Sequence, residues 1–226
     1  MIRTSATQQQ QGRPVFFVVP ATTLIGALSG TVVGSAAVIA IGALGGLAWG
    51  LIVGRTTYWL GRREGSGQKL AARSLYLGVL VATTLFGGSL FAMMLYASAL
   101  STPETVLGLM RAPFGGGFAF FVVFNSLMEW FLLPAILYLN WHLRTRRTLI
   151  VASATLYYLS RAWTYLYFVP RIFEFMEAPA GGMLTPDLVS QIIQWVNLSW
   201  IRTAVDGVVA ILFLIATSRS DGQDNA

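Results

Sequence analysis

The sequence predicts an all-α membrane protein, a polytopic bundle of six transmembrane helices, and three observations support this fold class. Hydrophobic residues make up 55% of the 226-residue chain and charged residues only 11%, whereas about a quarter of the residues in soluble domains are charged. The apolar runs are long and continuous rather than alternating, which favours helices over the strands of a membrane barrel. The net charge of +6 is clustered between these runs, as the positive-inside rule describes, so we expect no nucleic-acid partner.

The first apolar run, residues 15–54, carries no charged side chain. A single helix of this length would measure about 60 Å, twice the roughly 30 Å hydrocarbon core. We therefore expect two crossings with a turn near residues 34–36, where small residues permit tight backbone geometry. The alternative is one long helix, which would give five spans. The run is also longer than the apolar segment of a signal peptide, so we expect a retained first span, with cleavage near Ala36 or Ala37 as the alternative.

Glycines recur every four residues through this run, at Gly26, Gly30, Gly34, Gly42, Gly46, Gly50 and Gly54. Steps of four drift by about 40° around a helix of 3.6 residues per turn, so the series cannot form one flat face on one straight helix. Divided between two helices, it gives two small-residue faces that can approach closely in lipid. We therefore predict helix packing within a hairpin over residues 15–60, rather than the lining of a pore.

Four further spans are expected at residues 75–100, 117–140, 149–169 and 196–217, which together form a four-helix bundle over 75–217. A short surface helix should begin near Pro103, and the last helix should begin near Thr185 and Pro186. With six spans, all clusters of basic residues fall on one side of the membrane. The positive-inside rule then places the N-terminal segment 1–14, the basic loops and the tail 218–226 on the cytoplasmic side of the cell membrane.

Ionisable residues inside the predicted spans are the main candidates for function. Glu129 lies near the middle of the fourth span, with Asn125 one helical turn earlier, and Arg161 lies near the middle of the fifth. A short loop joins these spans, so they should be antiparallel neighbours and Glu129 should meet Arg161. Inserting one charged side chain at a helix centre costs about 2.5–3.5 kcal/mol. An opposite charge at 4 Å attracts it by about 4 kcal/mol at an effective dielectric constant of 20.

The sixth span repeats this pattern, because Arg202 and Asp206 are four residues apart on one helical face. Polar and aromatic neighbours share these faces, and Pro134 should release backbone carbonyls near Glu129. The predicted ligand-binding residues are Asn125, Glu129, Tyr158, Arg161, Tyr165, Trp195, Arg202 and Asp206. Glu129 and Asp206 are also the candidate catalytic residues.

Three functions are compatible with such a set of polar groups. The first is a pocket that binds a hydrophobic or amphipathic small molecule, the second is a proton-coupled carrier, and the third is a subunit of a larger membrane complex or a self-associating scaffold. In the third case the charges would only fix helix register. The chain has no cysteine and a single histidine, His142, so we expect no metal site and no haem or iron–sulfur cofactor.

Three segments of residues 75–217 resemble the anthrone oxygenase-like group of small four-helix membrane proteins. They are TLFGGSLFAMMLYASALS, then RTLIVASATLYYLSRAWTYLYFVP with Pro170 at a helix end, and WVNLSWIRTAVDGVVAILFLIA. The resemblance implies a four-helix bundle with an intramembrane pocket, and in some members a cofactor-free oxidation of an aromatic substrate. It also implies that Trp195 and Arg202 contribute to the site. The glycine-rich hairpin is not part of this pattern.

Overall fold

The computed structural model of the protein describes residues 14–32, 34–61, 66–111, 118–177 and 184–219. These residues form helices and turns, with no strand among them. The elements are α2 (Val15–Thr31), α3 (Ala36–Gly61), α4 (Ser66–Ser98), α5 (Pro103–Arg111), α6 (Phe118–Ser126), η2 (Leu127–Leu132), α7 (Leu133–Asn140), α8 (Arg144–Trp163), η3 (Thr164–Phe168), α9 (Val169–Glu177) and α10 (Pro186–Ser218). The predicted cytoplasmic segments 1–14 and 218–226 lie almost wholly outside the described residues.

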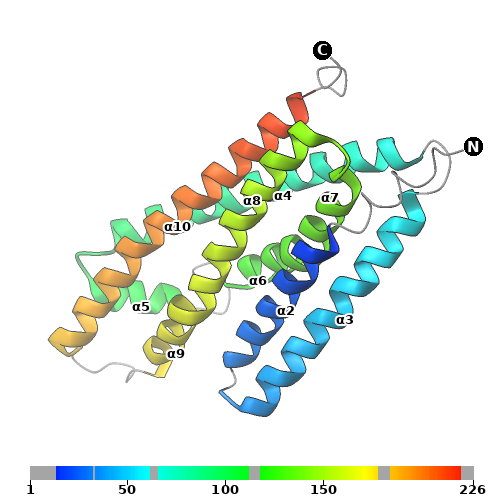
Figure 1. Cartoon of the computed structure of the whole chain (residues 1–226). Helices are drawn as coiled ribbons and strands as arrows, with labels where there is room; N and C mark the ends of the chain where they lie inside the picture. The colour runs from blue at the N-terminus through cyan, green and yellow to red at the C-terminus, as the bar shows by residue number, and fades with distance from the viewer. Residues whose placement is uncertain (1–13, 33, 62–65, 112–117, 178–183, 220–226) are drawn as a thin grey trace, which may run out of the picture.

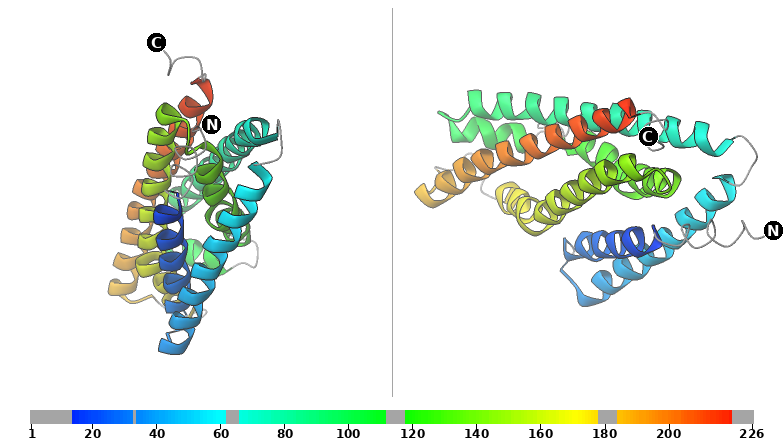
Figure 2. Two further views of the ribbon diagram at one scale, coloured as in Figure 1. Left: turned by 45° about the vertical axis from the view of Figure 1, so that its right-hand side comes forward. Right: turned by 45° about the horizontal axis from the view of Figure 1, so that its top comes forward.

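The long helices run side by side and alternate in direction (Figure 1). The start of α2, the end of α3, the start of α4, the α7–α8 connection and the end of α10 all lie toward one end of the molecule, and a second view agrees (Figure 2). Helix α10 packs against α4 and α8, and α7 packs against α3 and α4. The basic residues Arg55, Arg73, Arg144 and Arg219 therefore share one end of the bundle.

Four helical segments among the described residues are long and apolar enough to cross a membrane: Ala36–Leu60, Gly67–Ser98, Ala119–Asn140 and Pro186–Ser218. These helices support the prediction of a membrane protein. Helix α2 is apolar but has only 17 residues. The run α8–η3–α9 is not among the four, and Arg161, several tyrosines and its basic first turn all lower its hydropathy.

The first apolar run is divided between α2 and α3, as predicted, and the turn contains Gly34 with φ of +77°. The two helices touch through their backbones. A Cβ atom added to Gly26 would overlap the carbonyl group of Gly42, and one added to Gly46 would overlap that of Thr22. Only glycine permits this separation, because any side chain would push the helices apart.

Not every glycine of the series packs between these two helices. Gly30 and Gly50 do, against Ile39 and Val19 respectively, whereas Gly54 faces Tyr138 of α7. Gly34 has open space where a Cβ would lie and serves the turn instead of a helix contact, because its left-handed φ suits glycine.

Two helices widen just before an internal proline, whereas α2 contains Pro20 without a π turn. The π-helical turn η2 precedes Pro134, and η3 precedes Pro170. Proline has no N–H and its ring displaces the carbonyl four residues earlier, and a π turn is one way to accommodate that carbonyl. The expectation that Pro170 ends its helix is wrong, because the helix continues as α9 to Glu177.

Candidate functional site

Glu129 and Arg161 form an ion pair between η2 and α8. The Arg161 Nε–H donates to Glu129 Oε1, and the hydroxyl of Tyr165 donates to Oε2 at 3.2 Å. The side chains of Glu129 and Arg161 are only 1% and 13% exposed. Both carboxylate oxygens therefore have a donor, which is what a buried charge requires.

Tyrosine hydroxyls extend this pair into a network that we call the closed cluster: Asn125, Glu129, Tyr157, Tyr158, Arg161 and Tyr165. The Tyr158 hydroxyl donates to the backbone carbonyl of Glu129 at 3.1 Å, and the Tyr157 hydroxyl donates to Asn125 Oδ1 at 2.8 Å. The Arg161 guanidinium also lies 4.8 Å from the ring centre of Tyr165. The structure thus brings together five of the eight predicted ligand-binding residues.

Proline chemistry contributes to the shape of this cluster. The carbonyl of Trp130, four residues before Pro134, accepts a hydrogen bond from Trp49 Nε1 on α3 at 2.7 Å. The adjacent Glu129 carbonyl accepts the Tyr158 hydroxyl already described. As expected, the region around Pro134 supplies backbone carbonyls as acceptors for side chains, and one of them holds the hairpin against the bundle.

Arg202 and Asp206 are arranged differently, and we call them the open pair. Asp206 Oδ2 accepts a hydrogen bond from the hydroxyl of Ser89 on α4 at 3.0 Å. The Arg202 guanidinium instead stacks over the ring of Phe168 in η3, 4.5 Å from its centre. Within the described ranges, Arg202 makes no ion pair or hydrogen bond.

Arg202 and Asp206 are four residues apart on one face of α10, as predicted, but they form no ion pair in the part of the chain that the structure describes. Both side chains leave the same face of α10, but the helices on either side offer them different partners. The hydroxyl of Ser89 holds Asp206 against α4, whereas Phe168 lies beneath Arg202 on the side of η3. Spacing along one helix predicts proximity, but the contacts from neighbouring helices decide the direction of each side chain.

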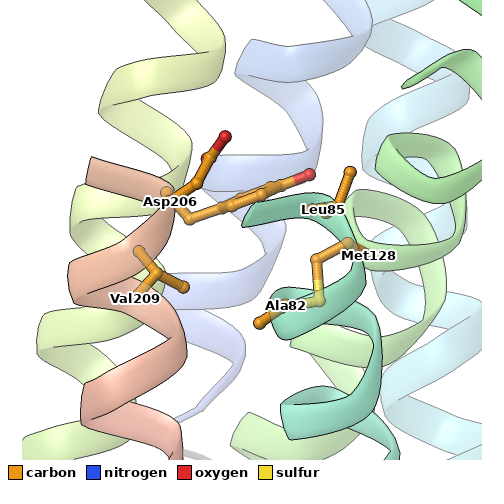
Figure 3. A pocket seen from close by; sticks show the side chains of 6 residues that line it. Ala82, Leu85, Met128, Asp206 and Val209 are labelled. Carbon is orange, nitrogen blue, oxygen red and sulfur yellow. The ribbon is translucent and has the colours of Figure 1, made fainter. Parts of the chain in front are cut away.

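A small cleft lies beside Asp206 and connects the two groups of residues. Asp206 and Val209 on α10 face Ala82 and Leu85 on α4 and Met128 on η2 (Figure 3). Tyr157 of the closed cluster also lines this cleft. The cleft has no room for a water molecule in this conformation, so a ligand would have to separate the helices that line it.

Trp195, predicted as a ligand contact, is only 3% exposed. Its Nε1 donates to the Phe168 carbonyl at 3.3 Å. Its ring lies edge-on to Phe168 and to Tyr96, with ring centres 5.7 and 5.8 Å apart. Trp195 therefore fixes the position of Phe168, on which Arg202 stacks.

Ser89 and Phe168 were not predicted from the sequence, and Tyr157 was predicted on the Arg161 face but not among the ligand-binding residues. Ser89 follows two glycines inside an apolar helix, and that polar interruption was a usable signal. Phe168 carries no comparable signal, because its position depends on the π turn before Pro170. For metal binding, no three His, Cys, Asp or Glu side chains gather anywhere in the described part of the chain.

Comparisons with known proteins do not narrow the function. No family model, no curated protein and no solved structure matches this chain. The resemblance of residues 75–217 to the anthrone oxygenase-like group therefore stays a prediction.

Proposed function

We propose that the protein is a six-span integral membrane protein that binds an amphipathic small molecule within the bundle formed by its last four spans. Helix α2 and the run α8–η3–α9 would cross the membrane together with the four long apolar helices. The alternating helix directions and the shared basic end support this topology. By the positive-inside rule, that end and both termini face the cytoplasm.

The open pair is the observation that carries the binding proposal. Two opposite charges sit four residues apart in a spanning helix, yet each is directed to a different neighbour. Leaving such charges unmatched in the membrane is costly, and ionisable groups that are kept there usually serve a pathway or a ligand. In the closed cluster, in contrast, Glu129 and Arg161 pair with each other, and the cluster is suited to stabilising the packing of the helices.

The proposed site lies where α4, η3 and α10 meet. Arg202 would bind the polar head of the ligand, and Phe168 would form one wall. Of the two predicted catalytic candidates, Asp206 is the better placed to exchange a proton. Its Oδ1 has no hydrogen bond to any described residue, whereas both oxygens of Glu129 are occupied.

Photolabelling of the full-length protein in nanodiscs tests this site. A set of diazirine-bearing amphiphiles with neutral, anionic and cationic heads should label peptides that contain Phe168 or Arg202, and Arg202→Gln should reduce that labelling. Arg171→Gln is the matched control, because the Arg171 side chain is 37% exposed and already pairs with Glu174 at 2.5 Å. Labelling confined to the lipid-facing sides of the helices would refute the proposal.

A proton-coupled carrier is the second candidate, and the position of Tyr157 favours it. Its hydroxyl donates to Asn125 of the closed cluster, and the residue also lines the cleft beside Asp206, so Tyr157 connects the closed cluster to that cleft. Proton uptake by proteoliposomes that contain a pH-sensitive dye tests this function. Tyr157→Phe should abolish an uptake that the wild type supports, and a wild type indistinguishable from empty liposomes would exclude it.

A further inference from the structure

We infer that the ligand held at Arg202 is an amphiphile with an anionic head, a carboxylate or a phosphate. This inference rests on the proposed function, since it names the class of molecule that the site takes. It starts from the guanidinium group itself. Arginine carries five N–H donors and stays charged, and no described residue accepts a hydrogen bond from Arg202.

A charged guanidinium group without hydrogen-bond acceptors is unfavourable at the depth where Arg202 lies. Residue 202 lies 16 residues before the end of α10 at Ser218, which places it about 24 Å along the helix axis from the cytoplasmic end. This position falls within the roughly 30 Å hydrocarbon core, in its outer third. Unsatisfied polar groups at such a depth cost several kcal/mol each, so a group with matching acceptors should bind there.

The geometry selects an anion over a neutral head. A carboxylate or phosphate presents two oxygens that match the guanidinium fork. Arg202 Cζ lies over the ring of Phe168, 4.5 Å from its centre, and no described residue accepts a hydrogen bond from the guanidinium N–H groups. The natural counter-charge, Asp206, is held by Ser89 and does not occupy those donors.

The surroundings also fit an amphiphile rather than a free ion. The wall beneath the head is aromatic, since Phe168 lies edge-on to Trp195, which in turn lies edge-on to Tyr96. Next to Arg202, Ile201 is 53% exposed on the outer surface of the same helix. An alkyl chain could therefore extend along α10 into lipid while its head reaches Arg202 from the outer leaflet.

Competition against one photoprobe tests the class of head group. Full-length protein in nanodiscs of neutral phosphatidylcholine is labelled with a diazirine-bearing palmitic acid. Palmitate, dodecyl phosphate, hexadecanol and a phosphatidylglycerol are then added separately as competitors. Palmitate and dodecyl phosphate should displace the probe, whereas hexadecanol, with the same chain as palmitate and no charge, should not.

Substitution of Arg202 separates head recognition from loss of fold. Arg202→Gln should weaken probe binding about tenfold to a hundredfold, the range expected for one charge-assisted contact. Arg202→Lys should retain part of the affinity, and Arg171→Gln should leave it unchanged. The thermal unfolding midpoint of each variant in the same nanodiscs shows whether the fold persists.

Each outcome decides a different question. Equal competition by hexadecanol would overturn the anionic head while leaving the proposed binding function intact. Absence of labelling at the site in the wild type would refute both the anionic head group and the proposed binding function. Displacement of the probe by phosphatidylglycerol would support the inference and identify a membrane lipid as the source of the anionic head. Displacement by palmitate and dodecyl phosphate, but not by phosphatidylglycerol, would also support the inference and identify a single-chain amphiphile as the ligand.

Discussion

The closed cluster and the open pair use the same two residue types, an acid and an arginine, with opposite results. In the closed cluster, Glu129 and Arg161 come from different elements and meet directly, and tyrosine hydroxyls satisfy the remaining acceptors. In the open pair, Arg202 and Asp206 come from one helix and turn to different neighbours. A buried charge can therefore either stabilise the fold or stay available for a ligand. The hydrogen bonds and ion pairs that each charged side chain makes distinguish these two roles.

The largest effect should come from breaking the closed cluster. Glu129→Gln keeps the shape of the side chain but leaves Arg161 charged, buried and unpaired. We expect a loss of about 3–5 kcal/mol in the free energy of unfolding, as for other buried pairs that lose one partner. Reversible unfolding in mixed micelles, followed by tryptophan fluorescence, measures it.

The double variant Glu129→Gln with Arg161→Gln is the control for this prediction. It should recover much of the lost stability, because no uncompensated charge remains. If the two substitutions simply add, the ion pair does not contribute as described.

Loss of the hairpin contact should have the next largest effect. Helix α2 packs on both α8 and η3, so it covers the closed cluster. Gly46→Val places a branched side chain against the backbone of Thr22 and should cost about 1–3 kcal/mol, as overpacking does. The same unfolding assay applies.

Gly45→Val is the matched control, because a Cβ at Gly45 meets nothing within 4 Å. The two glycines are adjacent in sequence, so their intrinsic helix propensities cancel. Equal stabilities of the two variants would contradict the backbone contact between α2 and α3.

A smaller effect is expected at Ser89. Ser89→Ala removes the hydrogen bond to Asp206 and should cost about 1 kcal/mol, the usual net value of one hydrogen bond. Ser98→Ala controls for the serine hydroxyl, because Ser98 bonds only its own helix, at the Leu95 carbonyl. If Ser89→Ala left the stability unchanged while Ser98→Ala lowered it, the Ser89 hydroxyl would not hold Asp206 against α4 as described.

The smallest change in stability should follow Arg202→Gln, and this variant tests the comparison most directly. Arg202 makes no hydrogen bond or ion pair to the described residues, and its removal relieves the cost of a charge in the membrane. We expect the free energy of unfolding to stay within about 0.5 kcal/mol of wild type or to rise. A loss as large as that of Glu129→Gln would show that Arg202 supports the fold.

Much of the bundle follows from the sequence because the membrane imposes simple rules. Charge-free lengths indicate where helices cross, and Gly34 falls in the turn that length requires. The start of α10 was also predictable, since Thr185 Oγ1 accepts the backbone N–H of Leu188, as an N-cap residue does. Glu129 and Arg161 could be paired because they lie at equal depth on spans joined by a short loop.

The remaining features depend on contacts between helices that a single sequence does not display. The direction of Arg202 is set by Phe168, and Phe168 is set by a π turn and by Trp195. Pro170 looks like a helix end, but the widened turn before it lets the helix continue. Sequence patterns therefore predicted where the helices lie. The difference between the closed cluster and the open pair arises from packing between helices.

The backbone contact between α2 and α3 also constrains how the chain enters the membrane. Helix α2 has 17 residues, or about 26 Å, which is slightly shorter than the hydrocarbon core. At Gly26 and Gly46 the backbones of α2 and α3 lie in direct contact, and α3, with 26 residues, is the longer of the two helices. We therefore expect the two helices to leave the translocon as a preassembled unit, with α2 retained there until α3 has been synthesised.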